Sequence, residues 1–157
     1  MTKIYLGADH AGFELKEKIK IWLSTQNLAF DDCGNYILNP NDDYPDFAEK
    51  VALRVVKNNG KGILVCGSAE GICIAANKIK KIRAVNPHGL IQVKRARLDE
   101  DANILCLAGG GTLQPIPGMS LAKAKKLITV FLETPFSNQA RHIRRLAKIR
   151  KLEEKYG

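Results

Sequence analysis

The stretch Gly62–Lys78, GILVCGSAEGICIAANK, decides how the rest of the chain is interpreted. A short apolar run ends on Cys66, a turn of small residues follows, and a segment rich in Ala and Ile comes next. This order predicts a buried strand, a tight loop and a helix. Such a loop directs several backbone N–H groups and a helix N-terminus toward one point, which suits an anion or a developing oxyanion.

Cys66 closes the predicted strand and therefore faces that same point. A helix N-terminus lowers the pKa of a nearby thiol, so the sequence predicts a thiolate that acts as a base or a nucleophile. The alternative is that Cys66 is a small buried apolar residue and that the glycines only make a tight turn. The residues by themselves leave both interpretations open.

The rest of the chain repeats this alternation of strand and helix. Apolar and β-branched runs predict strands, and apolar residues at helical spacing predict amphipathic helices. We expect strands near residues 3–8, 28–32, 63–65, 83–85 and 103–107. We expect helices near residues 13–23, 44–56, 70–80, 87–98, 120–132 and 138–155, with irregular structure over 33–43 and 108–118.

Strands that alternate with helices favour an α/β fold, a three-layer α/β/α sandwich with a five-stranded parallel Rossmann-like sheet. One domain is expected to span residues 1–157, since a chain of this length builds a single sizeable core. The extra C-terminal helix, at about 138–155, has no strand of its own to cover. We therefore expect it to pack on a partner subunit.

Asp9 and His10 directly follow the first predicted strand. Polar side chains just beyond the carboxyl end of a strand lie where ligands bind in an open α/β sheet. These two residues are therefore candidates for ligand contact. The alternative makes Asp9 a helix N-cap and His10 a turn residue with no further role.

The chain has a formal net charge of +9, and positive charge is concentrated toward the C-terminus, where residues 138–157 hold seven Lys and Arg against two Glu. Such a segment is consistent with nucleic-acid binding, with a solvated helix face or with a binding site for an anionic small molecule. The chain contains no known nucleic-acid motif, which disfavours the first of these. No apolar run approaches the ~20 residues needed to cross a bilayer, so no membrane partner is expected.

The four cysteines, Cys33, Cys66, Cys73 and Cys106, are spread along the chain without a Cys-x-x-Cys pair. This spacing argues against a zinc site and against a disulfide scaffold. The N-terminal residues run straight into a strand pattern and lack the features of a signal peptide. A reducing cytoplasm is the expected location.

Several motifs together resemble one known family. They are Gly7-Ala8-Asp9-His10-Ala11-Gly12, Asp43-Tyr44-Pro45, the stretch from Cys66 to Lys78, Ile82-Arg83-Ala84-Val85, and Arg141-His142 with Arg145. Over nearly its whole length the chain resembles the type B ribose-5-phosphate isomerase family, which also contains galactose-6-phosphate isomerase subunits. The resemblance implies an aldose–ketose isomerase that acts on a phosphorylated sugar through an enediolate, without a metal or other cofactor. Ribose 5-phosphate and ribulose 5-phosphate are the implied pair.

The resemblance also implies roles for individual residues. Cys66 would be the base that moves a proton between C1 and C2, and the loop amides would stabilise the enediolate oxygen. Sugar contacts would come from Asp9, His10, Tyr44, Gly67, Ser68, Gly71 and Glu100, and phosphate contacts from His10, Arg141 and Arg145. Members of the family are homodimers or homotetramers whose sites are built from two subunits, which would explain the surplus helix.

Four positions depart from the family pattern. The family carries His-Asn-Asp-x-Asn before its last strand, and its histidine opens the sugar ring, whereas this chain has Asp99 followed by Glu100. Gly110 stands where an arginine is usual, and Ala69 replaces a loop glycine. Asp99 would take over as the acid–base group only if its pKa were raised. The alternative is a catalytically impaired homologue that binds or senses sugar phosphates.

Overall fold

The computed structural model describes residues 3–111 and 117–157. Within these residues five parallel strands form one sheet in the order β2-β1-β3-β5-β4. The strands are β1 (Ile4–Ala8), β2 (Phe30–Asp32), β3 (Lys61–Cys66), β4 (Ala84–Val85) and β5 (Ile104–Ala108). Residues 112–116, in the middle of the irregular segment predicted over 108–118, lie outside the described part.

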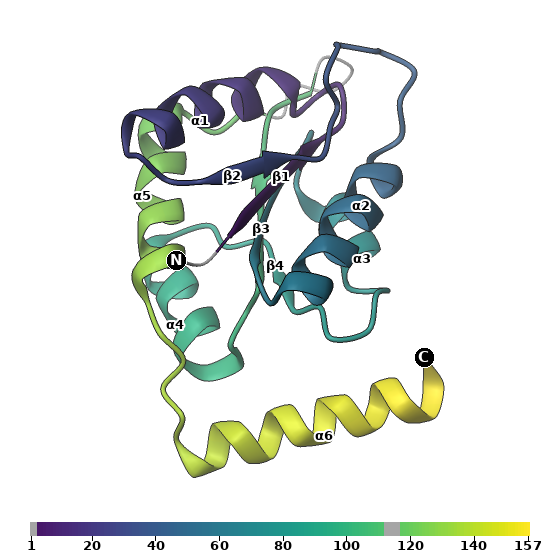
Figure 1. The fold of residues 1–157 in the computed structure, drawn as a ribbon, viewed down its shortest axis with the longest axis vertical. Helices are drawn as coiled ribbons and strands as arrows, with labels where there is room; N and C mark the ends of the chain where they lie inside the picture. The colour runs from purple at the N-terminus through teal and green to yellow at the C-terminus, as the bar shows by residue number, and fades with distance from the viewer. Residues whose placement is uncertain (1–2, 112–116) are drawn as a thin grey trace.

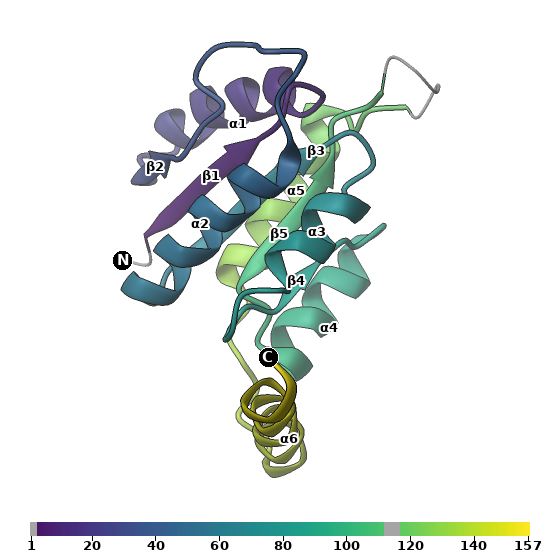
Figure 2. The same ribbon diagram turned by 90° about the vertical axis from the view of Figure 1, so that its right-hand side faces the viewer.

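Helices cover both faces of this sheet (Figures 1 and 2). They are α1 (Phe13–Thr25), α2 (Tyr44–Asn58), α3 (Glu70–Ala76), α4 (Leu90–Glu100), α5 (Leu121–Glu133) and α6 (Ala140–Tyr156). Residues of α1, α4 and α5 pack on one face, and residues of α2 and α3 pack on the other. The predicted three-layer α/β/α sandwich with a parallel sheet is therefore confirmed.

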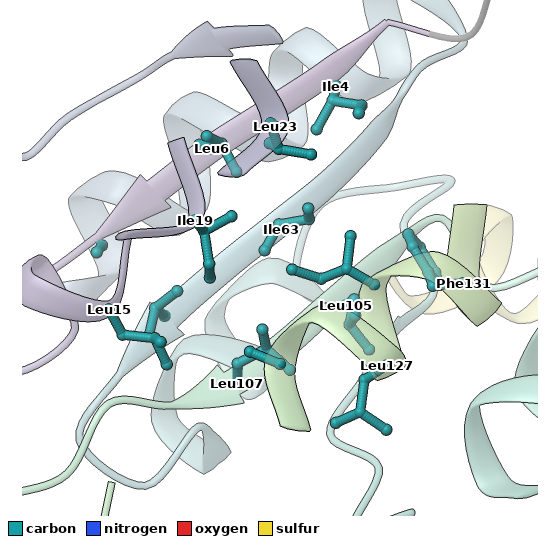
Figure 3. Close-up of a cluster of buried hydrophobic side chains, with 14 of the residues drawn as sticks. Ile4, Leu6, Leu15, Ile19, Leu23, Ile63, Leu105, Leu107, Leu127 and Phe131 are labelled. Atoms are coloured by element: carbon teal, nitrogen blue, oxygen red, sulfur yellow. The ribbon is translucent and has the colours of Figure 1, made fainter. Parts of the chain in front are cut away.

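Side chains along the central strands alternate between the two faces, as a period of two requires. In β3, Ile63 and Val65 join the cluster beneath α1 and α5, which Figure 3 shows together with Leu105 and Leu107 of β5. The intervening Leu64 and Cys66 face α2 and α3. This alternation fixes the side of the sheet on which the thiol lies.

Two helices differ from their predicted bounds. The helix expected to continue to about residue 80 ends at Ala76, because the Asn77 side chain turns to β4, where it accepts from the Ala84 N–H (2.8 Å) and donates to the Ala84 carbonyl (2.9 Å). The next helix begins at Leu90 and not at residue 87. It also runs through Asp99 and Glu100, which the sequence analysis placed beyond its end.

The last helix, α6, lies apart from the layers, beyond the C-terminal end of α4 (Figure 1). The Glu153 carboxylate accepts a hydrogen bond from the Lys81 backbone N–H at 3.1 Å and so fastens α6 to the loop before β4. Ile143 and Leu152 leave more than half of their surface exposed. None of the helices in the described residues is long and apolar enough to cross a membrane.

Candidate active site

The strand order changes direction between β1 and β3, since the chain passes from β1 to β2 on one side and places β3 on the other. Ligands bind at such switch points, outside the carboxyl ends of the strands. Ala8 and Val65 pair at this end of the sheet, and the Asp9 N–H donates to the Val65 carbonyl at 3.3 Å. Asp9 and Cys66, the next residues along the two strands, therefore lie close together at the carboxyl end of the sheet.

Cys66 is almost fully enclosed, with 4% of the residue exposed. Burial raises the pKa of its thiol, and the nearby charge of Asp9 adds to this increase. The backbone N–H groups of Ile72, Ala69 and Ser68 act in the opposite sense and lower this pKa. The prediction that a helix N-terminus lowers the pKa of this thiol is therefore wrong, because the loss of solvent outweighs the amides at the start of a seven-residue helix.

The loop between β3 and α3 has the shape that the small residues predict. Ala69 is buried and has a φ of 74°, a left-handed conformation that favours glycine and costs an alanine about 1 kcal/mol. The N–H groups of Ala69 itself and of Ser68 before it are among those that lower the pKa of Cys66. Gly67 lies against the end of β5, where it accepts a hydrogen bond from the Gly110 N–H at 3.0 Å.

Asp9 is buried at the turn after β1, and its Oδ1 accepts from the Gly12 N–H at 2.9 Å. Burial raises the pKa of this carboxyl. The N-cap residue of α1 is Gly12, so the alternative that Asp9 caps the helix is wrong, and Asp9 instead closes the turn before it.

His10 is held by a residue that the sequence analysis did not single out. Asp42 Oδ1 accepts from the His10 backbone N–H at 2.8 Å and lies 2.8 Å from its ring Nδ1. This hydrogen bond raises the pKa of His10 against the effect of partial burial. His10 therefore has a fixed partner at this turn, and its contact with a ligand stays a prediction. Asp42 sits in a loop of Asn and Asp residues, where no pattern distinguishes it.

Tyr44 begins α2 and reaches across to α3. A β-carbon at Gly71 would meet the Tyr44 ring at 2.8 Å, so only glycine fits beneath the ring. Six of the residues predicted to contact the substrate come from the segments that follow β1 and β3, or, for Tyr44, from the start of α2 that lies against α3. They are Asp9, His10, Tyr44, Gly67, Ser68 and Gly71. A cavity of about 530 Å³ borders this region and is lined in part by Ser68, Glu70, Asn86, His88 and Lys123.

Asp99 and Glu100 lie at the opposite edge of the sheet. β3 and β5 pair in register, with Cys66 beside Ala108 at their carboxyl ends. The two acids end α4 just before Ile104 begins β5, and the strand between Ile104 and Ala108 spans about 13 Å. Within one chain these residues therefore do not reach Cys66.

Arg141 and Arg145 also lie far from Cys66, because α6 sits beside the C-terminal end of α4. Arg141 Nε donates to His142 Nε2 at 3.0 Å, and the same ring nitrogen lies 3.7 Å from Asp99 Oδ1. His142 is buried, and its Nδ1 lies 2.7 Å from Ser137 Oγ. Asp99, His142 and Arg141 thus form one connected group.

The predicted site residues therefore fall into two halves. One half, which we call the thiol half, contains Asp9, His10, Tyr44, Cys66, Gly67, Ser68 and Gly71. The other, which we call the arginine half, contains Asp99, Glu100, Arg141 and Arg145. Across the described ranges, no group of three His, Cys, Asp or Glu side chains is arranged to hold a metal ion.

Comparison with known proteins supplies the family. The model of the Ribose/Galactose Isomerase family matches residues 4–149. The chain belongs to this family. It is 37% identical over 153 residues to a probable ribose-5-phosphate isomerase B of Mycoplasma genitalium, an alignment that covers 96% of this chain and 95% of that protein.

Solved structures of family members agree with the fold. A ribose 5-phosphate isomerase of Thermotoga maritima has a TM-score of 0.86 at 38% identity, covering 96% of this chain and 98% of that one. Ribose-5-phosphate isomerase B of Mycoplasma genitalium with bound ribulose-5-phosphate has a TM-score of 0.88 at 35% identity, covering 98% and 97%. The family and the kind of enzyme predicted from the motifs, an aldose–ketose isomerase of the ribose-5-phosphate isomerase type, are confirmed.

Proposed function

We propose that this protein interconverts an aldose phosphate and a ketose phosphate through an enediolate, with Cys66 as the base. Ribose 5-phosphate and ribulose 5-phosphate are the pair to test first, since the similar protein of Mycoplasma genitalium was solved with ribulose-5-phosphate bound. The observation that supports this proposal most is the Cys66 thiol at the switch point of the sheet, on which the amides of Ser68 and Ala69 in the loop and of Ile72 in α3 act.

The chemistry follows from that arrangement. The Cys66 thiolate takes the proton from C2 of the open-chain aldose, the C2–H electron pair forms the C1=C2 bond, and the carbonyl π pair moves to O1, which gives the enediolate. The thiol then returns the proton to C1 while the hydroxyl proton of O2 passes to O1 and the C2=O bond forms, which gives the ketose. A buried thiolate is a strong base because its pKa is raised, and the amides of Ser68, Ala69 and Ile72 offset part of the cost of its charge. A cytoplasmic location would keep this thiol reduced.

The phosphate group requires cations, and the thiol half offers His10. Arg141 and Arg145 occupy successive turns of α6 and suit a phosphate gripped from one helix face. Because they lie at the other edge of the sheet, a complete site takes its thiol half from one protomer and its arginine half from a second. The exposed apolar residues of α6, Ile143 and Leu152 among them, would be covered in such a dimer or tetramer.

Asp99 favours a second candidate function. The resemblance assigns ring opening to a histidine at this position, and a carboxylate has a much lower ordinary pKa than an imidazole. A protein that binds sugar phosphates without turning them over is the alternative. His142 is buried beside Asp99, and His88 is exposed and lines the cavity next to Ser68, so the group at the ring-opening position itself is the Asp99 carboxylate.

Proton exchange in deuterium oxide tests both functions. With aldose and ketose phosphates of five and six carbons, we expect deuterium to enter at C1 or C2, and Cys66→Ala to reduce this exchange at least about 10²-fold. Cys73→Ser, a change at a half-buried cysteine of α3, is the matched control and should retain exchange. Full exchange in Cys66→Ala would exclude Cys66 as the base.

The same samples separate the two candidates. No exchange with any sugar phosphate, together with a rise in melting temperature when a sugar phosphate is added, would identify a binding protein. Exchange without net formation of product from the cyclic aldose would place the defect in ring opening alone.

A further inference from the structure

Asp42 makes more contacts with the thiol half than its place in an irregular loop suggests. Its Oδ1 accepts from the backbone N–H of His10 and lies 2.8 Å from the ring Nδ1 of the same residue, 32 positions away in sequence. Its Oδ2 accepts from the side-chain amide of Asn35. The Asp42 side chain is 9% exposed, whereas that of His10 is 40% exposed.

The carboxylate of Asp42 is held from the far side as well. Asn35 donates its backbone N–H to the Ala8 carbonyl at 2.9 Å, and its side-chain oxygen accepts from the Ile37 N–H at 2.9 Å. The loop that carries Asp42 is therefore fastened to the end of β1, the strand that delivers His10. Position and direction of this carboxylate are set before any ligand arrives.

The protonation of the His10 ring follows from its partner. An ionised carboxylate only accepts hydrogen bonds, so Nδ1 carries a proton and Nε2 is the ring nitrogen left for other contacts. Within residues 3–111 and 117–157, Nε2 of His10 has no hydrogen-bond partner. The acidic groups that act on this ring are Asp42, through its hydrogen bond, and Asp9, the preceding residue, and both raise the pKa of His10.

We propose that Asp42 is a positioning residue: it fixes the His10 ring so that Nε2–H donates a hydrogen bond to the phosphate group of a sugar phosphate. A protonated imidazole suits a phosphate dianion because both Nδ1 and Nε2 then donate. Without Asp42 the ring is free to turn, and its proton is no longer held on Nδ1. This inference rests on the proposed function for the identity of the ligand, but not for the His10–Asp42 pair itself.

The first test measures the ring directly and does not need activity. The full chain contains three histidines, so His88→Gln and His142→Gln leave the imidazole signal of His10 assignable by NMR. We expect Asp42→Asn to lower the pKa of His10 toward that of an exposed histidine. Asp43→Asn, which removes an equal charge from an exposed neighbour without a contact to His10, is the matched control and should leave it unchanged.

Inorganic phosphate is the probe for binding. In the wild-type protein we expect phosphate to shift the His10 signal and to raise its pKa further, because the dianion stabilises the protonated ring. In Asp42→Asn the affinity for phosphate should fall about 10-fold, the effect of losing a well-aligned charged hydrogen bond. Asp42→Glu, which keeps a carboxylate, should recover a raised His10 pKa, whereas Asp42→Ala should not.

Kinetics with ribose 5-phosphate complete the test. We expect Asp42→Asn to raise KM about 10-fold and to change kcat less than about twofold, because the phosphate lies away from the carbons that react. Absence of turnover in the wild type would overturn the proposed function, while the phosphate titration would still decide the role of Asp42. An unchanged His10 pKa and phosphate affinity in Asp42→Asn, or a loss of thermal stability alone, would overturn the positioning role.

Discussion

The ring of Tyr44 lies directly on the backbone of Gly71, so closely that a β-carbon at residue 71 would come within 2.8 Å of the ring carbon Cζ. Tyr44 is the first residue of α2, and Gly71 lies in the first turn of α3. The next residue, Ile72, provides one of the amides directed at Cys66. The aromatic contact therefore helps to hold the amides around the thiol.

Gly71→Ala should disturb this arrangement. The added methyl group displaces either the ring or the loop amides, and we expect kcat/KM to fall about 10-fold or more, since small misplacements in a site are costly. The double variant Tyr44→Ala with Gly71→Ala removes the clash. Its kcat/KM should therefore fall by less than the product of the two single-variant reductions. Strictly multiplicative effects would show that the contact does not couple the two residues.

The pH dependence of the reaction should report the buried thiol. Because burial raises the pKa of Cys66, little thiolate is present at neutral pH, and kcat/KM should rise with pH by up to about tenfold per unit until that pKa is passed. Asp9→Asn removes a charge that adds to the increase and should move the midpoint to lower pH. A profile that is flat from pH 7 to 9 would argue against a thiolate base.

Asp99→His should improve ring opening. An imidazole titrates near neutral pH and therefore suits proton transfer there. We expect this variant to turn over cyclic ribose 5-phosphate about 10-fold faster than the wild type does. Proton exchange with ribulose 5-phosphate, which is open-chain because its O5 carries the phosphate, is the internal control and should change little. Equal effects on both substrates would contradict a role in ring opening.

Two impaired variants should complement each other if the site is shared. Cys66→Ala lacks a working thiol half, and Arg145→Ala has a weakened arginine half. A mixed dimer holds one intact site, so refolding the two variants together in equal amounts should restore about a quarter of wild-type activity. Each variant refolded alone is the control. Activity no higher than the sum of the separate variants would place both halves in one chain.

Lys61 should make the stability of the fold depend on pH. Burial, aided by the charge of Arg97, lowers the pKa of Lys61 to about 8, and its Nζ donates to the Leu132 carbonyl at 2.9 Å. The unfolded chain binds this proton up to a pKa of about 10.4, so the free energy of unfolding should rise between pH 8 and pH 10.

Lys61→Met provides the comparison for that slope. Urea denaturation of both proteins at pH 8, 9 and 10 should give a difference in unfolding free energy that grows with pH in favour of the wild type. Other groups that titrate in this range contribute equally to both proteins. A constant difference would mean that Lys61 keeps an ordinary pKa in the fold.

The periodic patterns of the sequence were enough to predict the elements of the fold but not their limits. The predicted end of the third helix was too late because nothing in the pattern reveals that the Asn77 side chain turns to β4. The fourth helix begins late because the Gln92 side chain accepts from the His88 and Gly89 N–H groups. Such side-chain contacts depend on the folded backbone, which hydrophobic spacing does not describe.

The candidate site was predictable where chemistry follows directly from chain order. Asp9 follows β1 and Cys66 ends β3, and parallel strands bring their carboxyl ends together. Two properties of the site could not be predicted from the sequence. The pKa of Cys66 depends on how much solvent the surrounding helices exclude. The partner of His10 depends on which of several similar loop acids folds back onto β1, and in the structure this residue is Asp42.

The placement of α6 has a consequence for how much product a given amount of protein can make. If guanidinium groups and thiol act only across a boundary between copies, a solitary chain is an inert precursor. The rate of product formation would then follow the square of the protein concentration under strong dilution and become proportional to that concentration once assembly is complete. The amount of protein, and not only the supply of substrate, would therefore determine whether the reaction proceeds.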